Sequence, residues 1–148
     1  MEITKDIKNI GVNDYDIDLF EGQYILEKGM AYNSYVILDE KVAVMDTVDK
    51  IAVERWLANL DKALNGRTVD YLVVQHLEPD HSAGIDVLAE KYPDMKIICS
   101  SAALRMIPNF CDTPVERFEG VKENDTLSLG EHTLTFVMAP MVHWPEVM

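Results

Sequence analysis

The chain has 148 residues, of which 48% are hydrophobic, so its length and apolar content suit one domain with a buried core. Its 26 acidic residues outnumber its 13 basic ones, and the formal charge of -13 argues against partners such as nucleic acid or an anionic membrane surface. The sequence has neither a cationic start followed by an apolar stretch nor an apolar run long enough to cross a bilayer. We therefore expect a cytoplasmic protein.

The first predicted elements form a β-hairpin between Tyr35 and Asp46, with a polar turn at residues 39–41. A helix should follow, with Asp49 as its N-cap and Gly66 directly after its last residue, Asn65. Its apolar residues recur at steps of three and four, which predicts one buried stripe made of Val53, Trp56, Leu57, Leu60 and Leu64.

The rest of the chain alternates strands and helices. The predicted elements are a strand at 69–75, a helix at about 85–92 closed by Pro93, a strand at 96–100, a helix at 102–109, and a hairpin of 126–129 with 133–138 that turns at 130–131. The order ββ-α-β-α-β-α-ββ predicts an α/β layered domain with a mixed sheet.

A group of potential metal ligands directly follows the apolar run at 71–74. Within the six residues HLEPDH, four side chains can bind a metal, namely those of His76, Glu78, Asp80 and His81. In an extended segment, residues at i and i+2 point to the same side, so His76 and Glu78 can face one metal position, and Asp80 and His81 can face a second after the proline turn. Imidazole nitrogen combined with carboxylate oxygen suits iron, manganese or zinc. A solvated acidic turn is the alternative, but open α/β sheets place their sites at such strand ends.

Other reactive or aromatic residues are expected to be structural. Cys99 and Cys111 match neither a CxxC redox pair nor a zinc knuckle, so we predict two buried thiols. Trp56 lies on the apolar helix stripe and should belong to the core. His132 stands beside a predicted hairpin turn and is expected to be a solvated surface residue.

A family resemblance depends on several motifs together. The segments 33–35 (NSY) and 45–49 (MDTVD) precede the HLEPDH loop, and His143 follows the last predicted strand. This pattern resembles the metallo-β-lactamase-like domain of flavodiiron proteins, over nearly the whole chain from about Val12. Hydrolases of that superfamily usually show HxHxDH, whereas this chain has Glu78 at the second histidine position, which is typical of the flavodiiron branch. An anionic oxygen donor there favours redox-active iron over zinc.

The resemblance implies a role for each motif residue. It implies that one iron is bound by His76, Glu78 and His143, and the other by Asp80 and His81, although some family members hold this last imidazole away from the metal. Asp46 would orient a ligand imidazole, with a plain turn residue as the alternative. For Trp144 we favour packing at the end of the domain over shielding of the metal pocket.

The implied fold is part of an αββα sandwich. Residues 1–148 would be the N-terminal portion of the di-iron domain, apparently truncated, without the bridging carboxylate, a further histidine and the flavodoxin-like domain that carries FMN. With only five ligands, the di-iron centre should be weakly held. A sheet face without its facing layer should also cause self-association into a homo-oligomer.

Three functions remain open from the sequence. The first is a di-iron oxidoreductase that reduces dioxygen to water, nitric oxide to nitrous oxide, or both, with electrons from FMN and a rubredoxin-like donor, as the resemblance implies. The second is a zinc-dependent hydrolase in which Asp80 is the general base; Glu78 argues against it. The third is an inactive fragment that only folds and associates.

Overall fold

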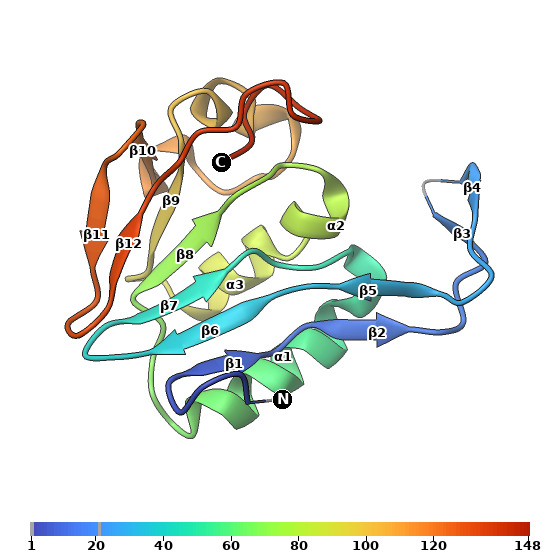
Figure 1. The fold of residues 1–148 in the computed structure, drawn as a ribbon, viewed down its shortest axis with the longest axis horizontal. Helices are drawn as coiled ribbons and strands as arrows, with labels where there is room; N and C mark the ends of the chain where they lie inside the picture. Colours follow the sequence, from blue (N-terminus) through green and yellow to red (C-terminus); the bar gives the residue numbers. More distant parts are fainter. Residues whose placement is uncertain (1, 21) are drawn as a thin grey trace.

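In the computed structural model, which describes residues 2–20 and 22–148, the centre is one mixed sheet (Figure 1). Its strand order is β1 (Ile7–Asn9), β6 (Tyr35–Leu38), β7 (Val42–Met45), β8 (Tyr71–Val74), β9 (Lys96–Ser100) and β10 (Phe118–Val121). The first three strands pair antiparallel and β7 to β10 run parallel. The predicted α/β architecture with a mixed sheet is confirmed.

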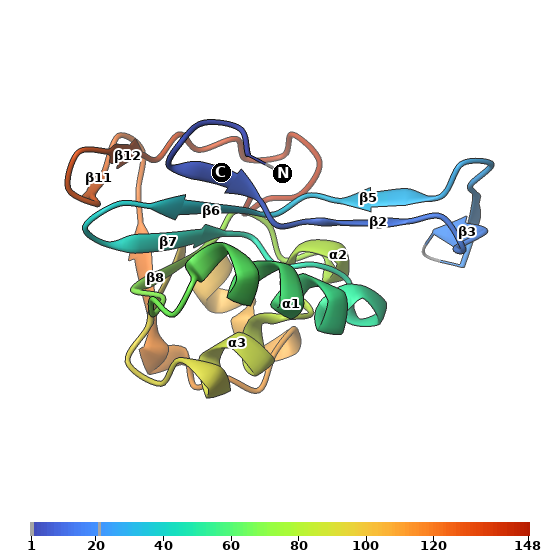
Figure 2. The ribbon, with the colours of Figure 1, turned by 90° about the horizontal axis from the view of Figure 1, so that it is seen from below.

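The elements outside the sheet lie on two sides of it. Figure 2 shows α1 (Val53–Leu64) and α3 (Ile85–Lys91) on one face, with the ribbon of β11 (Thr126–Ser128) and β12 (Thr133–Thr135) and the C-terminal loop on the other. The paired strands β2 (Val12–Asp14) and β5 (Met30–Tyr32) extend away from the body as an arm, which continues into β3 (Leu19–Phe20) and β4 (Tyr24–Ile25). The short helices are η1 (Lys50–Ala52), α2 (Pro79–Ser82), η2 (Ala103–Arg105), η3 (Ile107–Asn109) and η4 (Val115–Arg117).

Helix α1 joins the main core to the end of the sheet where the predicted site lies. Its predicted stripe is buried except for Leu57, which is half-buried. Trp56 is 0% exposed, which confirms that this residue belongs to the core. The Trp56 indole N–H donates to Ser34 Oγ at 3.0 Å, and that hydroxyl donates to the carbonyl of Asp46 at 2.9 Å. Asp49 accepts from the N–H of Ile51, but the first turn is the 3-10 helix η1. A buried polar chain therefore connects the core to Asp46.

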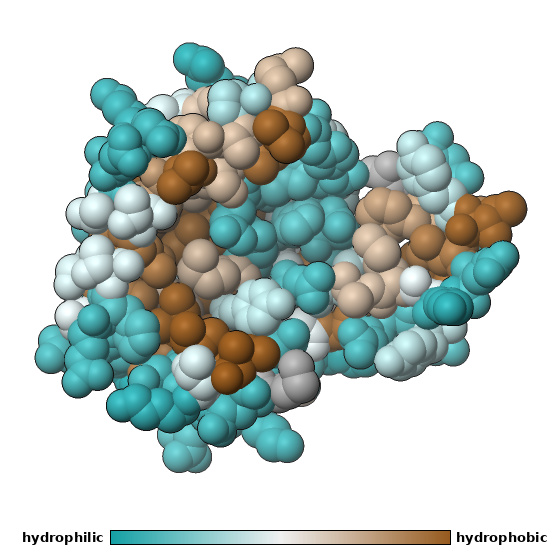
Figure 3. Space-filling model, in the orientation of Figure 1, coloured by the Kyte–Doolittle hydropathy of each residue, from teal (hydrophilic) through white to brown (hydrophobic). Residues whose placement is uncertain are grey.

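The opposite face of the sheet is covered less completely. Ribbon β11–β12 packs there on two small apolar clusters, one around Val73 and Ile98 and one around Ile37 and Leu129. Figure 3 shows hydrophobic side chains on this side of the molecule and at the end of the arm. The most exposed large hydrophobic residues include Tyr15, Ile25, Val137, Met141 and Val142.

Several predicted elements differ from the structure. The helix expected at 102–109 is two 3-10 turns, η2 and η3, because Pro108 lacks the N–H that would donate to the carbonyl of Leu104 in a continuous α-helix. Strand β10 was not predicted, since Glu119 and Gly120 hide its apolar pattern. The strand expected at 133–138 ends at Thr135. Over the described residues, the longest helix is α1 with 12 residues, too short to cross a membrane.

The two cysteines and His132 also have defined surroundings. Cys99 is buried as predicted, and burial raises its pKa to about 12, whereas Cys111 is only half-buried and its pKa rises to about 11, mainly for the same reason. His132 is only partly solvated, with 32% of its side chain exposed, and it has a partner that the sequence did not predict. Its Nδ1 lies 2.7 Å from Asp39 Oδ2, and its backbone N–H donates to the same oxygen. The β6–β7 turn supplies this partner from a distant part of the chain.

Candidate metal centre

The site begins where two parallel neighbours, β7 and β8, end at the same edge of the sheet. Asp46 directly follows β7, and its N–H donates to the carbonyl of Val73 at 2.8 Å. Its carboxylate accepts from the backbone N–H of Gln75 at 2.6 Å and from the Gln75 side-chain amide at 3.0 Å. The φ angle of Asp46 is +54°, a left-handed conformation that aspartate tolerates better than most residues. These contacts fix the start of the loop that carries the predicted ligands.

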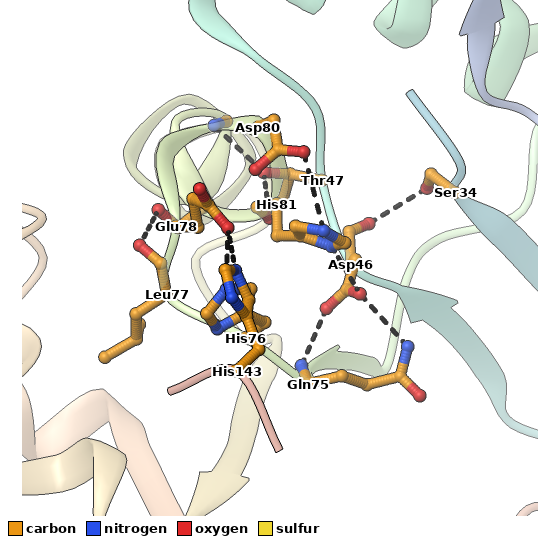
Figure 4. Close-up of polar contacts among 12 residues, drawn as sticks. Ser34, Asp46, Thr47, Gln75, His76, Leu77, Glu78, Asp80, His81 and His143 are labelled. Atoms are coloured by element: carbon orange, nitrogen blue, oxygen red, sulfur yellow. Dashed lines mark hydrogen bonds and ion pairs between the residues drawn. The ribbon is translucent and has the colours of Figure 1, made fainter. Parts of the chain in front are cut away.

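Three of the predicted ligands converge on one point (Figure 4). Glu78 Oε2 lies 2.9 Å from His76 Nε2 and 2.6 Å from His143 Nε2. One donor atom from each of the three residues lies within 4.8 Å of the others. The side chains of His76 and Glu78 are 7% and 10% exposed, whereas that of His143 is 58% exposed. Two imidazole nitrogens and one carboxylate oxygen thus form a site suited to a first-row metal ion.

Asp80 and His81 form a second group beside this cluster. Pro79 occupies the first turn of α2, which places both residues on that short helix. His81 Nδ1 lies 3.1 Å from Asp46 Oδ2, and His81 Nε2 lies 3.6 Å from Asp80 Oδ2. The rings of His76 and His81 are 5.2 Å apart between centroids. The geometry puts Asp46 where it can orient an imidazole, while the metal-binding roles of Asp80 and His81 stay predictions.

The charges of this second group influence one another. Burial raises the pKa of Asp80, against the opposing effect of His81. Burial alone would lower the pKa of His81, but the hydrogen bond and charge of Asp46 outweigh it, and the pKa is raised. Asp80 Oδ1 is buried without a hydrogen-bond partner among the described residues. A buried carboxylate oxygen in that condition is suited to accept a cation.

Glu146 was missed by the sequence reasoning. Its carboxylate oxygen Oε1 lies 2.7 Å from His76 Nδ1, the ring nitrogen that faces away from Glu78, and it accepts from the N–H of Leu77 at 3.0 Å. The sequence shows an acidic residue three positions after His143. It does not show the partner of that residue, because His76 is distant in the chain. Glu146 therefore belongs to the site through His76.

The C-terminal loop also brings an aromatic ring to the site. Trp144 lies edge-on to His76 with the centroids 5.0 Å apart, and it contacts Phe110 at 5.7 Å. The side chain thus packs the end of the domain, as predicted, and also covers the His76 imidazole. His143 itself has a φ angle of +95° and Met141 one of +64°. Non-glycine residues rarely adopt such angles unless surrounding contacts impose them.

Comparison with known proteins gives these residues a family context. The family described as ODP family beta lactamase matches residues 30–148. The chain belongs to this family. It is 35% identical over 150 residues to the anaerobic nitric oxide reductase flavorubredoxin of Vibrio vulnificus, covering 100% of this chain and 30% of that protein. It is also 35% identical over 147 residues to the nitric oxide reductase of Moorella thermoacetica, covering 99% and 37%.

Solved structures of relatives give the same result. The flavodiiron protein of Giardia intestinalis superposes with a TM-score of 0.91 at 27% identity, covering 99% of this chain and 36% of that one. Rubredoxin oxygen:oxidoreductase of Desulfovibrio gigas gives 0.88 at 33% identity, covering 99% and 37%. The predicted resemblance to flavodiiron proteins is confirmed. This ODP family chain spans about a third of the length of these relatives.

Proposed function

We propose that this chain forms part of the di-iron centre of a flavodiiron oxidoreductase that reduces dioxygen to water, nitric oxide to nitrous oxide, or both. The activities named for its relatives, a nitric oxide reductase and a rubredoxin oxygen:oxidoreductase, support this reaction class. The observation that carries the proposal is Glu78. Its oxygen lies between two imidazole nitrogens, at the position where hydrolases of the superfamily have histidine.

The donor atoms fit iron. His76, Glu78 and His143 would hold one ion, and Asp80 and His81 would hold the other. When bound, iron supplies electrons to a diatomic substrate, and an anionic oxygen donor suits it better than zinc. Asp46 would keep His81 in place through the contact at 3.1 Å. A pocket of about 250 Å³ borders Glu78 and Asp80 and is large enough to admit a small substrate.

The electron path and assembly belong to the same proposal. Electrons would arrive through FMN, from a rubredoxin-like donor, in the cytoplasm. A homo-oligomer would cover exposed apolar residues such as Val137 and Val142, which are 61% and 71% exposed. Sedimentation of the chain at micromolar concentration should give a dimer or larger assembly, and a clean monomer would count against this part of the proposal.

The metal site is tested by titration of the chain with ferrous iron under anaerobic conditions. Binding should raise the midpoint of thermal unfolding as iron is added. His76→Ala should weaken binding by at least the roughly 10–100-fold that loss of an outer partner of a metal ligand typically costs. The matched control is His132→Ala, which changes a histidine outside the site. Equal iron binding by wild type and His76→Ala would contradict the proposed ligands.

The choice between iron and zinc chemistry is tested at Glu78. Glu78→His recreates the hydrolase pattern and should shift the preference from iron toward zinc, whereas Glu78→Gln only removes the charge. A slow esterase activity in zinc-loaded wild type that Asp80→Asn abolishes would favour a hydrolase instead. Oxygen and nitric oxide consumption should appear only when the chain is combined with the complementary part of the domain and a reduced flavin donor. If that mixture shows no activity and binds no iron, the result would support the third function, an inactive fragment that only folds and associates.

A further inference from the structure

Glu146 is a buried acid on a loop, residues 139–148, whose other residues are exposed or half-buried. Its side chain is 0% exposed, whereas the neighbouring Met141 and Val142 are 75% and 71% exposed. Charged residues are almost never fully buried unless they are paired. The position of Glu146 therefore requires a compensating partner, and the partner in this structure is His76.

The contacts of Glu146 connect two distant segments. Its side chain contacts residues 75–82, here called the metal loop, with Oε1 2.7 Å from His76 Nδ1 and 3.0 Å from the backbone nitrogen of Leu77, whose N–H donates to it. Its backbone carbonyl accepts from Ser100 Oγ at 2.7 Å, at the end of β9. Two residues later, Met148 donates its N–H to the carbonyl of Gln75 at 3.1 Å. The loop that presents His143 is thus fastened to the loop that presents His76.

One feature of Glu146 does not suit a purely structural role. Its second oxygen, Oε2, is buried without a hydrogen-bond partner among the described residues. A buried ionised oxygen in that condition destabilises the fold. A carboxylate on the far nitrogen of a ligand imidazole, however, fixes the ring and makes it a stronger donor to a cation. The negative charge is useful when the opposite side of the ring faces a metal ion.

We propose that Glu146 is a positioning residue that holds His76 with Nδ1–H toward its own carboxylate and Nε2 toward the ligand cluster, while it anchors the strained segment carrying His143. The metal-binding part of this inference rests on the proposed function, but the orientation of His76 does not. The orientation of His76 and the docking of the segment that carries His143 then both depend on the Glu146 carboxylate.

The first measurement is nitrogen-15 NMR of the histidine rings in the metal-free chain. In wild type and in Glu146→Gln, whose side-chain oxygen still accepts, the His76 Nδ1 proton should be visible and slow to exchange. In Glu146→Ala it should be lost. Ser100→Ala is the matched control, because it removes a hydrogen bond to the same loop without changing the carboxylate, and it should keep the Nδ1 proton.

The second measurement is a cobalt(II) titration followed by absorbance. Affinity should fall roughly 10–100-fold in Glu146→Ala and by less in Glu146→Gln. Glu146→Gln should also unfold at an equal or higher temperature than wild type, because it removes a buried charge. Weaker metal binding together with an unchanged or more stable fold is a combination that a purely structural residue would not give. If Glu146→Ala does not fold, Glu146→Asp, whose shorter side chain withdraws the oxygen from His76, should show the same losses in smaller degree.

Distinct outcomes separate the two proposals. If Glu146→Ala keeps the Nδ1 proton and its cobalt affinity, or if Ser100→Ala reproduces every effect of Glu146→Ala, the positioning role is wrong. If wild type binds no cobalt, the proposed metal site fails, and the Nδ1 proton still decides whether Glu146 orients His76.

Discussion

The two loops that meet at the site are held in different ways. The metal loop, residues 75–82, leaves a buried parallel strand, and its proposed ligands His76 and Glu78 have side chains that are 7% and 10% exposed. The C-terminal loop, residues 139–148, carries His143 with a 58% exposed side chain and a φ angle of +95°. The first loop is organised by the sheet itself, whereas the second depends on a few docking contacts. A complete three-donor cluster therefore requires loop docking in addition to folding of the sheet.

The largest loss of stability is expected when the core residue that supports the metal loop is removed. Trp56→Ala deletes a fully buried ring whose N–H bonds to Ser34, the residue that holds the Asp46 carbonyl. We expect a loss of about 3–5 kcal/mol in the free energy of unfolding, measured with urea. Trp56→Phe, which keeps an aromatic ring, should lose less. A loss below 1 kcal/mol would show that the core does not support this loop.

A smaller effect is expected at the junction between β7 and the metal loop. Asp46→Ala leaves the N–H of Gln75 without its carboxylate acceptor and removes the contact of Asp46 with His81 Nδ1. The free energy of unfolding should fall by about 1–3 kcal/mol. Amide hydrogen exchange at Gln75 should accelerate. Asparagine tolerates the positive φ and retains one oxygen acceptor. The free energy of unfolding of Asp46→Asn should therefore lie between those of Asp46→Ala and wild type.

The C-terminal loop should respond locally. Trp144→Ala removes ring contacts to His76 and Phe110 from a half-buried position, and we expect less than about 1.5 kcal/mol of global destabilisation. Limited proteolysis should nevertheless cut residues 139–148 faster, while residues 75–82 stay protected. If proteolysis became equally faster in both loops, the two loops would not be stabilised independently of each other.

The smallest effect is expected far from the site, where Asp39 connects the β6–β7 turn to the β11–β12 turn. Burial alone would raise the pKa of Asp39. Backbone hydrogen bonds from His132 and Glu40 outweigh burial, and the pKa of Asp39 falls below its ordinary 3.8. Because the folded pKa is depressed, the stabilisation is present above about pH 4 and is lost as pH falls toward the folded value. Thermal unfolding from pH 7 to pH 3 should show this loss in wild type. Asp39→Asn should reduce the pH dependence, and an identical pH profile would contradict the assignment.

Much of the central sheet could be predicted because its patterns are local. The apolar run before His76 is strand β8, and the stripe that contains Trp56 is buried in α1 as periodicity predicts. The arm was not predicted, because its strands are two or three residues long, and β2 pairs with the more distant β5 across the intervening β3–β4 pair. Edge strand β10 was missed for a similar reason, since pairing with β9 compensates for the unfavourable Gly120.

For the site, the sequence by itself determined the donor types and their local spacing. HLEPDH places imidazole and carboxylate groups after a strand, and neighbouring residues of an extended chain and a short helix have little freedom to point elsewhere. The tertiary structure alone decided that His143 reaches Glu78, that Asp46 meets His81, and that Glu146 lies behind His76. These pairs are far apart in the chain, so folding of the sheet and docking of the last loop, which no local pattern encodes, bring them together.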